Sequence, residues 1–208
     1  MRSTKPTKIT LDPVATRAAI LDSATALFAE SGFAATSLNA IAQAADVPKS
    51  LILYHFETKE NLWQAVFREK GRMIFEAAQA IIDGEPGVTL EHVAIAKFRT
   101  LQQNPELVRL MAWMSLESRE PNPQIAAQAK KVRETIRSNP ERFPVPHGLQ
   151  PEDYFVVLMS AIDGFFRFRG VYSRMLDHPM NSPSYESDFL ENLLTLVRSQ
   201  KPENSHGL

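Results

Sequence analysis

Apolar residues recur at intervals of three and four positions along almost the whole chain, whereas the alternation typical of β-strands is nearly absent. In the second half, prolines lie between these periodic stretches, as expected for residues that interrupt a helix from within. They separate helices expected near residues 89–103, 106–118, 123–138 and 152–176, and a last helix is expected near 184–198. We therefore expect an all-α fold.

The amino-terminal residues predict a first helix with defined ends. Asp12 is a capping side chain, Pro13 suits the first helical position, and Gly32 ends the helix. Further along, Thr58 caps a helix that can extend from residue 59 to about residue 82. A helix of this length can link two domains.

Between these two helices, the sequence predicts two short helices joined by a tight turn. Thr36 or Ser37 caps the first short helix, Asp46 lies where a left-handed turn residue is needed, and Pro48 opens the second. The second short helix reads KSLILYHF from residue 49 to residue 56.

The outer face of that helix is unusual. At about 100° per residue, Ile52 and Phe56 share one face, whereas Ser50, Leu51 and Tyr54 point away from it. Short helices usually bury their leucines and tyrosines, so the outward Leu51 and Tyr54 indicate a surface that contacts a partner. A second short helix after a tight turn is suited to a groove of DNA.

Composition and charge exclude several classes of protein. The chain has 208 residues, of which 44% are hydrophobic, enough for one large or two small domains with a core. No transmembrane helix is expected, because the longest nearly apolar run, residues 154–166, is too short to span a bilayer. No secretory signal is expected, because no apolar region follows the basic residues of 1–11. The expected compartment is the cytoplasm, and no contact with a membrane is expected. The chain has no cysteine and its five histidines are scattered, so we expect no metal site and no other cofactor.

The balance of charge does not by itself indicate a nucleic-acid partner. The formal net charge is -1, and residues 1–60 contain six basic and six acidic residues. A DNA-binding domain without a net positive charge depends on a few well-placed contacts to phosphates, and a dimer doubles their number.

Three consecutive segments carry a resemblance to a known family. The segments ILDSATALFAESGF, ATSLNAIAQAADVPKS and LYHFETKENL together resemble the amino-terminal DNA-binding domain of TetR/AcrR-type transcriptional regulators. The resemblance implies a homodimer with two DNA-reading heads and a carboxy-terminal helical domain that dimerises and binds a small effector. Repression relieved by that effector, whose identity the sequence does not indicate, is the commonest arrangement in the family. Two-fold symmetry then predicts an inverted-repeat operator in double-stranded DNA.

The match is not complete. The family usually has glycine at the position of Asp46 and often has serine at that of Pro48. In the second short helix, Leu53 stands where the family commonly has a tyrosine that contacts phosphate.

Nine residues are candidates for contact with DNA. Lys49, Ser50, Leu51 and Tyr54 are expected to reach base edges, with Leu51 suited to a thymine methyl and Lys49 to guanine. The alternative is that these side chains contact only solvent or the first helix. The remaining candidates, for phosphate or an occasional base, are Thr36, Ser37, Asn39, His55 and Lys59. For Asn39, a solvated face is the simpler interpretation.

The second half is expected to hold the effector and the dimer interface. Candidate effector contacts are Phe98, Met111, Trp113, Met114 and Arg167, although most apolar residues at helical spacing only form the core. The helix near 152–176 is apolar around most of its circumference, so we expect it to pair with its copy and with the last helix. The expected interface residues are Phe165, Phe166, Leu190, Leu193 and Leu194, and the alternative is a central core helix in a monomer.

The expected domains are a flexible basic arm (1–11), a helix-turn-helix DNA-binding domain (12–58), a helical effector-binding and dimerisation domain (59–198) and a flexible tail (199–208). No catalytic motif is present, so we do not expect an enzyme. A second function remains open, in which the same fold holds DNA as an architectural or protein-interaction factor without a small-molecule effector.

Overall fold

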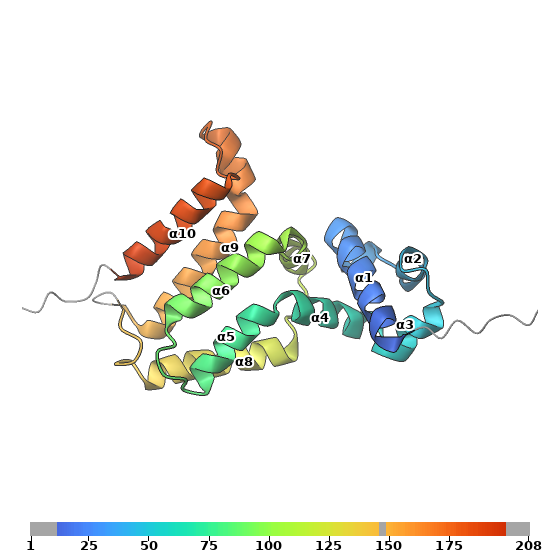
Figure 1. The fold of residues 1–208 in the computed structure, drawn as a ribbon, viewed down its shortest axis with the longest axis horizontal. Helices are drawn as coiled ribbons and strands as arrows, with labels where there is room; N and C mark the ends of the chain where they lie inside the picture. The colour runs from blue at the N-terminus through green and yellow to red at the C-terminus, as the bar shows by residue number, and fades with distance from the viewer. Residues whose placement is uncertain (1–11, 146–148, 199–208) are drawn as a thin grey trace, which may run out of the picture. The chain divides into compact units, whose positions relative to one another are not determined.

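The computed structural model describes residues 12–145 and 149–198, so the expected basic arm and tail lie outside the described residues. The described residues form ten helices and no strand, which confirms the all-α fold (Figure 1). None of these helices combines the length and the apolar character that crossing a bilayer requires. The helices are α1 (Pro13–Ala35), α2 (Leu38–Ala44), α3 (Lys49–Phe56), α4 (Lys59–Lys70), α5 (Arg72–Ile82), α6 (Leu90–Gln103), α7 (Pro105–Leu116), α8 (Pro123–Ser138), α9 (Pro151–Met175) and α10 (Pro183–Arg198).

The predicted capping and turn residues take their expected conformations in the amino-terminal helices. Asp12 Oδ1 accepts a hydrogen bond from the Val14 amide at 2.9 Å, and Gly32 interrupts the last turns of α1 with a φ of 77°. Ser37, rather than Thr36, caps α2. Asp46 has a φ of 52°, the left-handed conformation that the turn between α2 and α3 requires.

The chain divides into two compact units between Phe67 and Arg68. The first part of α4 packs into the amino-terminal unit. Trp63 is buried there, with its ring centroid 5.0 Å from that of Phe28 and 5.7 Å from that of Phe33. Aromatic packing of this kind fixes α4 against α1.

The long linking helix expected from residue 59 to about residue 82 is divided in the structure. Gly71 separates α4 from α5 and has a φ of -92° and a ψ of 5°, outside the helical region. Glycine is a poor helix former, because fixing its backbone costs more conformational entropy than for other residues. The helix is therefore more easily interrupted here. The linker is therefore two helices with a bend.

In the carboxy-terminal unit, α5 packs against α6 and α8, and α9 packs against α6, α7 and α8 (Figure 1). The predicted helix positions in this unit are confirmed to within two residues, and Pro105, Pro123 and Pro151 each stand at the start of a helix. The shared core of α5, α6, α8 and α9 consists of Ala78, Ile81, Leu90, Val93, Val132, Ile136, Phe143, Tyr154 and Leu158.

A buried polar group holds α10 in this unit. Glu186 of α10 is buried, forms an ion pair with Arg169 of α9 and accepts a hydrogen bond from Gln102 of α6 at 2.8 Å. Burial lowers the pKa of the Arg169 guanidinium, which still remains charged at neutral pH because arginine starts so high. Both carboxylate oxygens of Glu186 thus have partners, as a buried charge requires.

Candidate functional site

Helix α3 presents one apolar face to the core and the opposite face to solvent. Ile52 and Phe56 are buried, as the helical periodicity predicted. Tyr54, on the opposite face, is 77% exposed. An exposed tyrosine in the middle of a short helix offers both an apolar ring and a hydroxyl to a partner.

The other predicted residues of α2 and α3 differ in how far they are exposed. Lys49 and Ser50 are exposed on the first turn of α3, and Asn39 is exposed on α2. Leu51 and His55 are half-buried, and the Tyr54 and His55 rings meet edge to face with centroids 5.2 Å apart.

Two predicted residues are already engaged within the amino-terminal unit. Lys59 Nζ lies 3.5 Å from the Ala34 carbonyl oxygen and 4.2 Å from the centroid of the Phe33 ring. Ser37 Oγ accepts a hydrogen bond from the Ala40 amide at 3.0 Å, although its side chain stays exposed.

The structure does not place Thr36 on the surface. It is only 5% exposed, and its hydroxyl donates a hydrogen bond to the Gly32 carbonyl oxygen at 2.7 Å. The break of α1 at Gly32 leaves this carbonyl without a helical donor, and Thr36 supplies one. The Thr36 hydroxyl is therefore not available to a DNA phosphate.

Two residues near α3 were not among the candidates. Leu53 is 40% exposed beside Ser50 and Tyr54, and its angular position on the helix could have indicated this. Arg17 of α1 is exposed, and its guanidinium carbon lies 5.3 Å from the centroid of the Phe56 ring at the end of α3. No local pattern could have predicted the position of Arg17, because it depends on how α1 packs on α3.

The turn after α3 carries backbone strain. Glu57 has a φ of 64° and a ψ of -49°, and the Thr58 amide donates a hydrogen bond to the Phe56 carbonyl oxygen at 2.7 Å. These values describe a γ-turn with a positive φ, a rare conformation for a residue with a side chain. The turn brings the start of α4 close to the end of α3.

The arrangement of these helices agrees with the comparison to known proteins. Residues 20–66 match the model of the "Bacterial regulatory proteins, tetR family", and this match extends from α1 through both short helices into α4. The chain carries the amino-terminal domain of TetR/AcrR-type regulators. Like the other members, this TetR-family chain is a DNA-binding transcriptional regulator and not an enzyme.

Individual relatives of this TetR-family protein agree with the assignment. The chain is 36% identical over 83 residues to the HTH-type transcriptional regulator AcrR of Shigella flexneri, a match that covers 38% of this chain and 39% of that protein. It is 27% identical over 181 residues to the Escherichia coli K12 protein named "Probable acrEF/envCD operon repressor", which covers 82% of this chain and 79% of the relative. A solved structure from Streptomyces coelicolor shares the fold, with a TM-score of 0.66, 20% identity, and coverage of 87% of this chain and 96% of that one.

The residues predicted to contact an effector lie in different surroundings in the described part of this chain. Phe98 is buried against the rings of Phe165, Phe166 and Phe189. Met111 and Arg167 line a cavity of only about 10 Å³, and Trp113 and Met114 are half-buried on α7. Phe98 was predicted from helical spacing, which cannot separate a core residue from a pocket residue.

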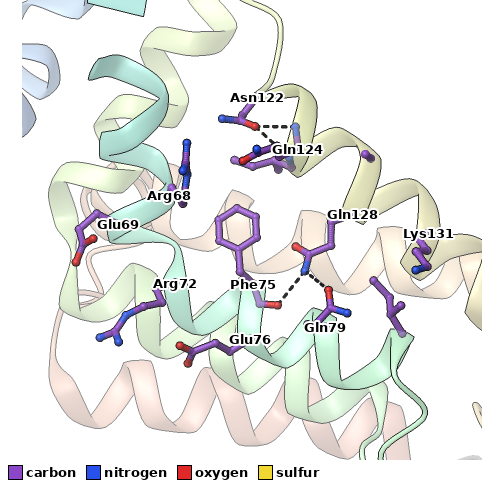
Figure 2. A pocket seen from close by; sticks show the side chains of 13 residues that line it. Arg68, Glu69, Arg72, Phe75, Glu76, Gln79, Asn122, Gln124, Gln128 and Lys131 are labelled. Carbon is purple, nitrogen blue, oxygen red and sulfur yellow. Dashed lines mark hydrogen bonds between the residues drawn. The ribbon is translucent and has the colours of Figure 1, made fainter. Parts of the chain in front are cut away.

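A larger cavity, of about 540 Å³, lies between α5 and α8 (Figure 2). Its volume is within the range of sites for small molecules. The lining residues come from the end of α4, from α5 and from the first half of α8 with its cap: Arg68, Glu69, Arg72, Phe75, Glu76, Gln79, Ile82, Asn122, Gln124, Ile125, Ala127, Gln128 and Lys131.

Most of the residues expected at the dimer interface pack within one protomer. Phe165 is 8% exposed, Phe166 and Leu194 are also buried, and Leu190 and Leu193 are half-buried. Phe165 stacks on Phe189 with ring centroids 4.0 Å apart, so these aromatic residues join α9 to α10 within one protomer. The apolar residues of α9 that do face solvent are Val156, Val157, Phe168, Val171, Tyr172 and Met175.

Proposed function

We propose that this protein is a transcriptional repressor that binds an inverted-repeat operator as a homodimer and releases it when a small molecule binds the carboxy-terminal unit. The observation that carries the proposal is the outer face of α3, where Tyr54 is exposed with Lys49 and Ser50. A helix with this orientation, second in a helix-turn-helix, suits the major groove.

The chemistry of the exposed residues supports contacts with bases at the centre of the α3 surface and contacts with phosphates at its edges. In the proposed complex, Lys49 donates to guanine, Leu51 contacts a thymine methyl, and Tyr54 contacts both base and backbone. His55, Lys59, Ser37 and Arg17 contact phosphates, with Asn39 at the edge of the surface. The Lys59 ammonium group already lies near the end of α1, which reduces the entropy it loses on binding phosphate.

The exposed side of α9 supports dimerisation. At about 100° per residue, Val157, Phe168, Val171 and Met175 fall on one side of the helix together with Gly164. A Cβ atom added at Gly164 would meet no atom of the described residues within 4 Å, so no close packing in that part of the protomer requires a glycine here. In the proposed dimer, this glycine lets the two copies of α9 approach closely.

Repression and its relief rest on two further observations. The Escherichia coli relative is named as a repressor, and a cavity of about 540 Å³ lies between α5 and α8. The cavity favours a ligand-controlled switch over an architectural factor, which has no use for such a space.

The proposal is tested by selecting duplexes from a random pool with the full-length protein. We expect enrichment of one half-site in two inverted copies, bound by two protomers in a salt-controlled gel shift. Enrichment of a single half-site, or of no sequence, would contradict the proposed mode of binding. Small molecules that raise the melting temperature are then added to the selected complex, and a repressor of this kind should release its DNA with at least one of them.

A further inference from the structure

We propose that the cavity between α5 and α8 binds an organic anion with an aromatic or similarly apolar body. The apolar body packs on Phe75, and the carboxylate or sulfonate of the ligand pairs with Arg68. This inference rests on the proposed function, since it identifies the chemical class of the effector and the place where it binds.

The centre of the cavity is apolar. The ring of Phe75 is half-buried and stands between α5 and α8, with Arg68 on one side and Gln128 on the other (Figure 2). Ile82 and Ile125 add aliphatic surface to the same lining. An apolar wall with a few polar groups at its edge is the usual composition of a small-molecule site.

Arg68 gives this apolar space a positive edge. Its side chain extends from the last turn of α4 toward Asn122 and Gln124, and it has no ion pair or hydrogen bond among the described residues (Figure 2). A guanidinium at the edge of an apolar space is suited to a planar carboxylate or a sulfonate.

The other charges of the lining do not cancel that of Arg68. Three side chains point away from the Phe75 ring: those of Glu69, Arg72 and Glu76 (Figure 2). Lys131 adds a second positive charge at the far end of the cavity. The interior therefore favours an anion over a cation.

Most of the amide groups in the lining are already committed. Asn122 Oδ1 accepts hydrogen bonds from the Gln124 and Ile125 amides at 2.7 and 3.3 Å, which caps α8. Gln128 Nε2 lies 3.1 Å from the Phe75 carbonyl oxygen, to which it donates a hydrogen bond. Arg68, rather than the first amides of α8, is therefore the group that recognises the anion.

The position of the site also explains how a ligand could control the protein. Arg68 lies before the bend at Gly71 and Phe75 lies after it, so a ligand that contacts both residues restrains the angle between α4 and α5. Since α4 begins inside the amino-terminal unit, this restraint acts on the segment that joins the two units.

The test uses the full-length protein and two fluorescent probes with the same ring system. One probe is anilinonaphthalene sulfonate, and the other is phenylnaphthylamine, which lacks the sulfonate. Arg68→Gln should weaken binding of the sulfonate about fivefold to tenfold and change binding of the neutral probe less than about twofold. Phe75→Ala should weaken both probes by about threefold or more. Arg137→Gln and Met73→Ala, which change an arginine and an exposed apolar residue outside the cavity lining, are the matched controls.

The proposal is overturned if Arg68→Gln changes both probes equally or neither, or if the control variants reproduce the losses. Melting temperatures of all variants identify any loss caused by unfolding, and Arg68→Gln is expected to fold normally because Arg68 is exposed. Failure of the proposed function is seen separately, in the selection of operator DNA without any probe. A protein that binds the selected duplex but shows no Arg68-dependent probe binding retains its function and loses this site.

Discussion

Lys97 Nζ of α6 lies 2.7 Å from Asp163 Oδ2 of α9. This pair explains an acidic residue within the nearly apolar run of residues 154–166, for which the sequence alone offers no partner. The side chains of Lys97 and Asp163 are 12% and 32% exposed, so the pair is partly withdrawn from water. Asp163 Oδ1 is buried and has no hydrogen-bond partner among the described residues, which makes the aspartate dependent on Lys97.

Replacing Lys97 with methionine should therefore destabilise the carboxy-terminal unit. Loss of one partner of a fully buried pair costs about 3–5 kcal/mol, and we expect about 1–3 kcal/mol here because water screens part of Asp163. Urea unfolding of Lys97→Met measures the change. The control Lys130→Met alters an exposed lysine of α8 and should stay within about 0.5 kcal/mol. Equal effects of the two substitutions would argue against this role for the pair.

Tyr54→Ala should weaken operator binding about tenfold without lowering the melting temperature, because its side chain makes few contacts within the protein. A gel shift at fixed salt on the selected duplex measures the affinity. Val14→Ala changes another side chain that is 77% exposed, on α1, and should leave the affinity unchanged. If Tyr54→Ala binds like the wild type, α3 does not read DNA through this residue.

A substitution on the exposed side of α9 should separate the proposed dimer without unfolding the protomer. Phe168→Glu should raise the dimer dissociation constant by at least about a hundredfold. Each protomer would contribute one glutamate, so the interface would bury two unpaired carboxylates. Sedimentation at micromolar concentration should show a dimer for the wild type and a monomer of unchanged helicity for the variant. Phe165→Glu is the contrasting variant, since Phe165 is buried within the protomer and its replacement should unfold the unit. A wild type that sediments as a monomer refutes the interface.

The strained turn at Glu57 predicts a stabilising substitution. Glycine adopts the positive φ of this position more readily, so Glu57→Gly should raise the free energy of unfolding by about 1 kcal/mol, after the entropy cost of glycine is subtracted. Glu57→Ala keeps the Cβ atom and should stay within about 0.5 kcal/mol of the wild type. Chemical denaturation compares the three proteins, and a gain in both variants would point to the charge of Glu57 rather than to its backbone.

The accuracy of the sequence predictions varied with the range of the interaction that decides each feature. The left-handed turn at Asp46 and the cap at Asp12 depend on neighbours a few positions away, and both were predicted correctly. Thr36 could cap a helix or fill a gap in the core, and only the packing of α1 decided between them. The expected single helix across Gly71 failed for a similar reason, because its apolar periodicity continues through a bend.

Sequence by itself determined the all-α class, the helix positions outside the bend at Gly71, and the face of α3 that carries Tyr54, because periodicity and capping act within a few residues of each position. Tertiary structure alone decided that Phe98 and Phe165 belong to the core, that Lys97 neutralises Asp163, and that a ligand-sized cavity lies between α5 and α8. These features join residues distant in the chain, and an apolar residue at helical spacing has the same pattern whether it meets a neighbouring helix, a ligand or a second protomer.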